Sequence, residues 1–246
     1  MKLLVCISKA PDTTAKIAFK DNDTAFNESG VQFIINPFDE WYALVRALEI
    51  KETSGGTVTV INAGPAENDP IIRKALAIGA DDAVRINMEG TDALAIAEEI
   101  AAYAGSESYD MILTGKETID YNGSQLGGMI AEILGWTSVS LASKMEINGN
   151  TATIERDVLG GKEILDVNTP FVLSAAKGMA EARIPNMRGI MAARTKPLNV
   201  VEPSNSTTYT KVKVYSLPPE KASCKYIDAE NPAELFDLLR TEAKVL

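Results

Sequence analysis

The side chains best suited to hold a ligand gather in one stretch of this chain, residues 114–127. The stretch runs Thr-Gly-Lys-Glu-Thr-Ile-Asp-Tyr-Asn-Gly-Ser-Gln-Leu-Gly, and a helical apolar pattern follows it. Small residues at Gly123, Ser124 and Gly127 let a backbone come close to a ligand. The first N–H groups of the following helix are unpaired, which suits a phosphate. These residues alone leave two alternatives open: a nucleotide-binding loop and a structural turn from strand to helix.

Composition excludes several other chemistries. The loop matches neither the Walker A pattern nor GxGxxG, so neither ATP hydrolysis nor a standard dinucleotide fingerprint is predicted. The chain has no histidine, which excludes a Ser-His-Asp or Cys-His arrangement built from this chain alone and a zinc site that uses imidazole. Its two cysteines, Cys6 and Cys224, lie far apart without metal-ligand spacing. We therefore expect no catalytic residue and no metal site.

The elements that must position the loop alternate in type through the first 140 residues. Helical apolar spacing begins near Trp41, Ile72 and Ala93. Short β-branched or apolar runs between these helices predict strands at 3–7, 31–35, 57–61, 83–86 and 111–114. This alternation implies βαβ units, and hence an α/β fold whose mainly parallel sheet has helices on both faces.

The pattern changes beyond about residue 136. The runs 144–147 and 151–156 flank an Asn-Gly turn and predict a β-hairpin. Gly160-Gly161 marks a second turn, and 171–174 is a buried strand. From about Pro203 the chain is polar and ends in a short helical pattern. We expect an α/β domain over 1–202 and an extended C-terminal arm over 203–246 that lies on another surface.

Four segments should meet at one edge of the predicted sheet, because ligands of open α/β sheets bind beyond the carboxyl ends of the strands. In the second of them, Asn36 suits a helix N-cap, Pro37 the first helical position and Asp39 the positive end of the helix. The four segments are 8–12, 36–39, 63–65 and 114–127.

The charge balance is acidic but uneven. The chain carries 24 basic and 34 acidic residues, a net charge of −10, which argues against a nucleic-acid partner. Between Glu181 and Glu202 there is no acid. That interval contains four cations, Arg183, Arg188, Arg194 and Lys196. The interval is either a solvated loop or a docking segment for an acidic partner surface.

No signal-peptide pattern and no apolar run of membrane-spanning length is present. We expect a cytoplasmic protein without an integral membrane segment.

Taken in order along the chain, several motifs resemble the β subunit of electron transfer flavoprotein. They are Asn36-Pro37-Phe38, the run 75–81 (Ala-Leu-Ala-Ile-Gly-Ala-Asp), the loop 115–127 and the segment 181–197. The resemblance extends from Leu3 to about Val201. It implies a Rossmann-like domain, a heterodimer whose α subunit holds most of the redox-active FAD, and flavin-dependent dehydrogenases as partners. It also implies that this chain binds AMP or, in electron-bifurcating members, a second FAD that meets NAD(H).

The resemblance also assigns residues to the two binding roles. Nucleotide contacts would come from Cys6, Asn36, Pro37, Phe38, Asp39, Ala63, Gly115, Lys116, Glu117, Thr118, Ile119, Asp120, Asn122, Gly123, Ser124, Gln125 and Leu126. Partner docking would fall to Glu181, Arg183, Ile184, Met187, Arg188, Ile190 and Met191. Met187 stands where the family has an anchoring leucine. Methionine is an adaptable apolar anchor, so we expect docking to persist with a different or looser partner pocket.

The nucleotide itself is not fixed by the motifs. After Ile119-Asp120 the AMP-type loop usually has an acidic run and the bifurcating loop Gly-Asp-Thr, whereas this chain has Tyr-Asn-Gly-Ser. Because the flavin-type motif is missing, we favour AMP over a second FAD. A different class of function also stays open: a stand-alone adenine-nucleotide-binding regulatory module, which would form a homodimer and have no use for segment 181–197 or the long tail.

Overall fold

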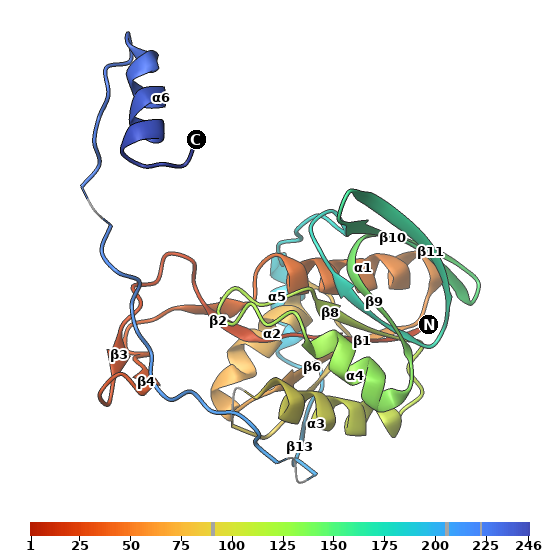
Figure 1. Cartoon of the computed structure of the whole chain (residues 1–246). Coiled ribbons are helices and arrows are strands. Elements are labelled where there is room, and N and C mark those ends of the chain that lie inside the picture. Colours follow the sequence, from red (N-terminus) through yellow and green to blue (C-terminus); the bar gives the residue numbers. More distant parts are fainter. Residues whose placement is uncertain (90–91, 205–206, 222) are drawn as a thin grey trace.

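In the computed structural model, which describes residues 1–89, 92–204, 207–221 and 223–246, a nine-stranded sheet has helices on both faces (Figure 1). Its strand order is β11-β10-β9-β12-β8-β1-β6-β7-β13. The strands from β9 to β13 in this order pair in parallel, whereas β10 and β11 are antiparallel to their neighbours. The α/β, Rossmann-like prediction is confirmed.

The strand bounds of this sheet are β1 Lys2–Cys6, β6 Thr57–Ala63, β7 Asp82–Ile86, β8 Met111–Gly115, β9 Thr137–Asn148, β10 Thr151–Val158, β11 Gly161–Asn168, β12 Phe171–Ala175 and β13 Leu198–Val201. Two small antiparallel pairs lie outside it: β2 (Lys9–Pro11) with β5 (Phe33–Ile35), and β3 (Phe19–Lys20) with β4 (Ala25–Phe26). The helices are α1 Asp39–Ser54, α2 Asp69–Ile78, α3 Ala93–Gly105, α4 Leu126–Leu134, α5 Met187–Ala193 and α6 Pro232–Thr241, with a 3-10 turn at Ala66–Asn68.

Alternation along the strands builds two cores. Leu3 and Val5 of β1 face the core shared with α1 and α2, whereas Leu4 and Cys6 face the core shared with α3 and α4. This is the two-residue period of a strand buried on both faces. Helices α1 and α4 therefore lie on opposite faces of the sheet, and each begins near the carboxyl end of β8.

One predicted strand lies elsewhere than expected. Residues 33–35 form β5, which pairs antiparallel with β2 and not with the parallel sheet. Parallel pairing with β1 needs a crossover connection, which is usually a helix. Residues 7–32 are all described, and they contain no helix. The places beside β1 are taken by β6 and β8, which are reached through helical crossovers.

The predicted hairpin is confirmed as β9 and β10, joined at the Asn-Gly turn, and Gly160-Gly161 lies at the turn into β11. The elements that were not predicted are the short strands β2, β3 and β4, the 3-10 turn, the strand β11, the short helix α5 and the edge strand β13. Between β13 and α6 the described residues form no helix or strand, and α6 stands apart from the rest of the molecule (Figure 1). Residues 205, 206 and 222 of the expected arm lie outside the described residues. No helix in the described ranges has the length and apolar character to cross a membrane.

Candidate functional site

Three of the four segments expected to converge, 8–12, 36–39 and 114–127, meet beyond the carboxyl ends of β1 and β8, and the fourth, 63–65, begins at the end of β6 beside β1. The Asn36 Nδ2 lies 3.2 Å from Ser8 Oγ and 3.3 Å from Asp120 Oδ1. Asn62, at the end of β6, donates from Nδ2 to the Ile7 carbonyl at 2.8 Å. Only the start of the first segment takes part, because residues 9–11 leave to pair with β5. We call this place the crevice.

A buried carboxylate ties β1 to α1 at the crevice. Glu40 is 4% exposed and accepts from the Ser8 backbone N–H at 2.6 Å and from its hydroxyl at 2.9 Å. Burial raises the pKa of Glu40 to about 8, the two Ser8 bonds oppose this rise, and the charges of Asp120 and Asp39 add to it. Glu40 was not predicted as a site residue. The available signal was its place three and four residues before Ala43 and Leu44, on the helix face that packs on the sheet.

Asn36 joins the start of α1 to the loop but does not cap the helix as predicted. Helix α1 begins at Asp39, with Phe38 in the N-cap position and without a side-chain cap. The fully buried Asn36 side chain instead accepts from the Ile119 N–H at 3.1 Å and donates to Ser8 and Asp120. Its side chain bonds other chain segments, and the helix begins three residues further on. The predicted place of Asp39 in the first turn of α1 is confirmed.

Phe38 occupies a backbone conformation that L-residues rarely adopt. Its φ is 65°, and its side chain is 56% exposed. Positive φ at a bulky residue is a strained geometry that tends to persist where surrounding structure imposes it. Here Pro37 and the buried Asn36 precede it and the buried Asp39 follows, so the phenyl ring is held outward at the rim of the crevice.

Two glycines allow the crevice walls to approach each other. A Cβ on Gly115 would lie 2.8 Å from both the backbone nitrogen and Cγ of Glu40. A Cβ on Gly127 would lie 2.8 Å from Thr114 Oγ1. Gly123 differs, since a Cβ there would meet only the Gln125 side chain, at 3.4 Å. The first two glycines are therefore needed for packing, whereas the third leaves room within the protein.

The loop between β8 and α4 carries its own charge pairs. Lys116 Nζ lies 2.9 Å from Glu117 and 3.9 Å from Asp39. The hydrogen bond with Glu117 raises the pKa of Lys116, and the same bond lowers the pKa of Glu117. Burial raises the pKa of Asp39, and Lys116 opposes that rise. The cation is thus shared between two carboxylates of the crevice.

The end of this loop turns sharply toward α4. Asn122 and Ser124 both have positive φ, at 50° and 51°. Ser124 Oγ donates to Glu117 at 3.2 Å. Residues 119–125 are exposed, whereas Thr118 and Leu126 are half-buried.

The start of α4 differs from the other helix starts around the sheet. Helix α1 carries Asp39 and Glu40 in its first turn, and α2 carries Asp69. Asp92 caps α3 by accepting from the Ala95 N–H at 3.0 Å. Helix α4 has neither an acid in its first turn nor a side-chain cap. Its unpaired N–H groups and partial positive charge therefore fit a phosphate group at the crevice.

The remaining predicted nucleotide contacts lie at the ends of β1 and β6. Cys6 is 3% exposed and its side chain belongs to the core shared with α3 and α4. Burial raises the pKa of the Cys6 thiol, and the charge of Glu40 adds to this rise. Ala63 is half-buried and follows Asn62, whose Oδ1 accepts from Asn68 at 2.9 Å. Cys6 can therefore offer a ligand only its backbone, and the pair Asn62–Asn68 supports this wall.

The predicted docking residues lie on a different face, which is apolar and exposed. Ile184, Met187 and Met191 are 84%, 74% and 57% exposed, and Ile190 is 40% exposed. We call residues 181–197 the docking segment. Glu181 and Arg188 are also exposed, whereas both terminal nitrogens of Arg183 are paired with Glu52.

Two hollows lie outside the crevice. One, of about 390 Å³, is under the docking segment, between it and the carboxyl ends of α1 and α2. Another, of about 460 Å³, is lined by residues of the β2–β5 region. The crevice is defined instead by convergent polar groups and an open helix start.

Comparison with known proteins identifies the family. The family model described as "Electron transfer flavoprotein domain" matches residues 23–206. The electron transfer flavoprotein subunit beta of Bacillus subtilis is 36% identical, with all of both chains covered. That of Syntrophomonas wolfei is 36% identical over 94% of this chain and 91% of its own length. The mitochondrial electron transfer flavoprotein subunit beta of Arabidopsis thaliana is 32% identical over all of both chains. The chain belongs to the electron transfer flavoprotein subunit beta family.

Proposed function

We propose that this chain is the β subunit of a heterodimeric electron transfer flavoprotein, an electron carrier and not an enzyme. It pairs with an α subunit that holds most of the FAD, binds AMP in the crevice as a structural ligand, and docks flavin-dependent dehydrogenases through residues 181–197. The bound flavin would accept and pass on the electrons; this chain's residues would bind, orient and dock.

The observation that carries the nucleotide proposal is the open start of α4. Its first turn offers N–H donors without a competing carboxylate or cap, directly after small residues of the loop. The fully buried Asn36 holds the loop in place from the other side. A single helix start accommodates one phosphate group, and the loop lacks the Gly-Asp-Thr of flavin-binding members. Both features favour AMP over a second FAD.

The C-terminal arm supports pairing with an α subunit. Helix α6 has no buried residue, and its Leu235 and Phe236 are 43% and 56% exposed. Exposed apolar side chains on an amphipathic helix need a covering surface. We propose that the α subunit provides it.

Release of ligands from the purified complex under denaturing conditions tests the proposal. One FAD and one AMP per heterodimer are expected, identified by chromatography and mass. Two FAD and no AMP would assign the chain to the electron-bifurcating type, with the loop as a flavin site that meets NAD(H). A homodimer of this chain that holds adenine nucleotide without an α subunit would favour a regulatory module.

A further inference from the structure

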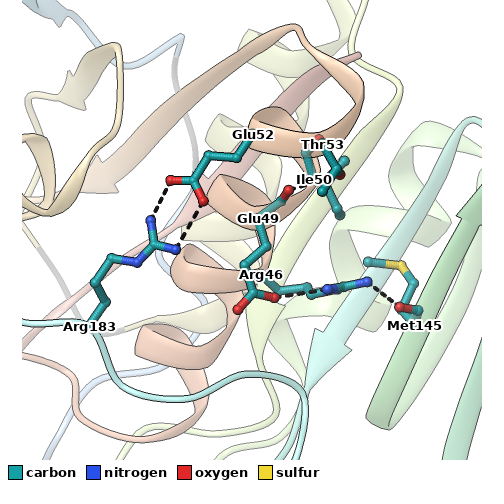
Figure 2. A network of polar contacts seen from close by, with 7 residues as sticks. All are labelled: Arg46, Glu49, Ile50, Glu52, Thr53, Met145 and Arg183. Carbon is teal, nitrogen blue, oxygen red and sulfur yellow. Dashed lines mark hydrogen bonds and ion pairs between the residues drawn. The ribbon is translucent and has the colours of Figure 1, made fainter.

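The docking segment is fastened at its start to helix α1. Arg183 places Nη1 2.6 Å and Nη2 3.1 Å from the two carboxylate oxygens of Glu52 (Figure 2). The Arg183 carbonyl accepts from the indole N–H of Trp41 at 3.2 Å. Paired bonds between guanidinium and carboxylate fix direction as well as distance. Arg183 is thus held by both its side chain and its backbone.

The other end of the segment is fastened to helix α2. Arg73 Nη1 donates to the carbonyls of Ala193 and Lys196, at 2.9 and 2.6 Å. The Lys196 ammonium donates to carbonyls of the last turn of α2 and beyond it, Leu76 at 3.0 Å and Ala80. This cation therefore serves the protein's own backbone.

Between these two ends, α5 lies directly on the end of α2. A Cβ at Gly189 would come 2.3 Å from the Ala77 carbonyl oxygen, so the helices touch through backbone. Asn186 caps α5 by accepting from the Gly189 N–H at 2.8 Å. Two apolar side chains of the segment, Ile184 and Met187, stay exposed.

The four cations of the segment therefore divide into two kinds. Arg183 and Lys196 are committed to groups of this chain. Within the described residues, the side chains of Arg188 and Arg194 form no ion pair and are exposed. A partner carboxylate could take the two-bonded position on Arg183 only by displacing Glu52.

We propose that Glu52 and Trp41 are positioning residues for docking: they hold Arg183 so that Ile184 and Met187 are presented in a fixed geometry, and Arg183 itself does not contact the partner. This rests on the proposed docking function of residues 181–197. Pre-ordering matters because a segment that becomes ordered only on binding loses conformational entropy at that step, and this loss weakens its affinity. The outward cations, Arg188 and Arg194, remain for an acidic partner surface.

Charge reversal separates positioning from direct contact. The heterodimer is prepared with Glu52→Arg, with Arg183→Glu, and with both substitutions, which restore the pair in opposite sense and keep the net charge. Glu163→Arg is the matched control, because it reverses the charge of an exposed carboxylate that pairs with Arg156 at 2.7 Å on β10 and β11, outside the docking segment. Two readouts are used: hydrogen exchange of amides 184–193, and the KM and kcat for reduction by a purified flavin-dependent dehydrogenase that reduces the wild-type heterodimer.

Each single reversal should speed exchange in residues 184–193 and raise the KM about two- to five-fold with little change in kcat, the range expected for a partly exposed ion pair. The double variant should return both readouts to within about twofold of wild type, and the Glu163→Arg control should match wild type.

Two results would overturn the proposal. Unchanged exchange in the single variants would mean that the pair does not hold the segment. Restored exchange with a KM that stays high in the double variant would mean that the cation at residue 183 contacts the partner directly. If no dehydrogenase tested reduces the wild-type heterodimer, the docking function fails first and this proposal falls with it.

Discussion

Glu40 and Ser8 close the crevice at its base: one buried carboxylate accepts both the backbone N–H and the hydroxyl of a residue 32 positions earlier in the chain. The bond crosses from the end of β1 to the first turn of α1, so the strand and the helix cannot separate without exposing a buried carboxyl group. Because this carboxyl titrates near neutral pH, the crevice carries its own pH dependence.

The first prediction concerns that titration. The folded-state pKa of Glu40, about 8, is above its ordinary value of 4.5. A raised pKa means that Glu40 favours the folded state fully below about pH 4.5, and that this contribution is lost as the pH rises through about 8. The difference in thermal midpoint between Glu40→Gln and wild-type heterodimers should therefore shift in favour of the variant from pH 5 to pH 9. The corresponding change in the free energy of unfolding is on the order of a few kcal/mol.

Ser8→Ala provides the second arm of that experiment. Loss of the hydroxyl donor should raise the pKa of Glu40 further, so the loss of stability should continue to higher pH than in wild type and be larger in total. Parallel pH profiles for wild type and Glu40→Gln would contradict the assignment.

The second prediction tests Asn36 as the link between α1 and the loop. Asn36→Ala leaves the Ile119 N–H without its acceptor, and we expect a loss of about 1–3 kcal/mol in stability. AMP recovered per complex should fall as well, because the loop is no longer held. Asn27→Ala, which removes only a turn contact to Ser29, is the control for a general asparagine effect. Full AMP occupancy in Asn36→Ala would count against this role.

The third prediction uses the open space at Gly123. A side chain there meets little of the protein and its φ is not positive, so Gly123→Val should fold, with the thermal midpoint of wild type from which the nucleotide has been removed. It should still lose nucleotide, because the side chain would intrude on the phosphate. Gly161→Val is the matched control, since Gly161 lies on β11, away from the loop, and a Cβ there meets nothing within 4 Å. Stoichiometric AMP in the Gly123 variant would move the ligand away from this loop.

The fourth prediction concerns Met187. Met187→Asp should leave folding and nucleotide content intact, because the side chain is 74% exposed, and should slow electron transfer from the partner dehydrogenase at least tenfold, about 1.4 kcal/mol. Leu159→Asp, at an exposed leucine of the β10–β11 turn, controls for loss of surface apolarity. Equal transfer rates in wild type and Met187→Asp would remove Met187 as the anchor.

The fifth prediction concerns the base of the arm. Asp92 Oδ2 accepts from the Tyr209 N–H at 3.0 Å and from the Thr210 hydroxyl at 2.7 Å. Asp92→Asn should keep the cap of α3 but speed amide exchange at residues 209 and 210. Glu98→Gln, which affects only the Tyr209 hydroxyl contact at 3.3 Å, should not.

The pH dependence of this contact has the opposite sign to that of Glu40. Hydrogen bonds, the largest from the Ala95 N–H, lower the pKa of Asp92 to about 2. Its contribution is therefore present above its ordinary pKa and lost only as the pH falls through about 2. Exchange at residues 209 and 210 that accelerates between pH 8 and pH 5 would contradict this.

Strong periodicity made most of the fold predictable. The buried strands and the helices α1 to α4 have apolar patterns that local physics decides. Strand β11 was missed because its outer residues, Lys162, Glu163 and Ile164, are exposed and do not alternate cleanly. Helix α5 has seven residues, one of them Gly189, and forms because α2 lies beneath it.

The location of the site could be predicted from the sequence better than the contacts within it. Topology alone brings the carboxyl ends of parallel strands together, so the four segments could be chosen from sequence. Two partners of Asn36, Ile119 and Asp120, are more than 80 residues away, and Arg183 pairs with a residue 131 positions earlier. Such distances exceed any local pattern, which is why Asn36 was expected to cap a helix and why the pair of Arg183 with Glu52 was not predicted.

The arm fastened at Asp92 also bears on how the assembly holds together. Its next contact is at Tyr215, which stacks on Phe19. From Tyr215 to Pro232 a chain can span at most about 60 Å. Helix α6 therefore stays within that distance of Tyr215. On the proposal that α6 binds the α subunit, this binding becomes intramolecular once the two subunits meet, with an effective concentration in the millimolar range. A weak contact at α6 would then slow dissociation of the whole complex, and cutting the tether would speed dissociation without altering a single interface residue.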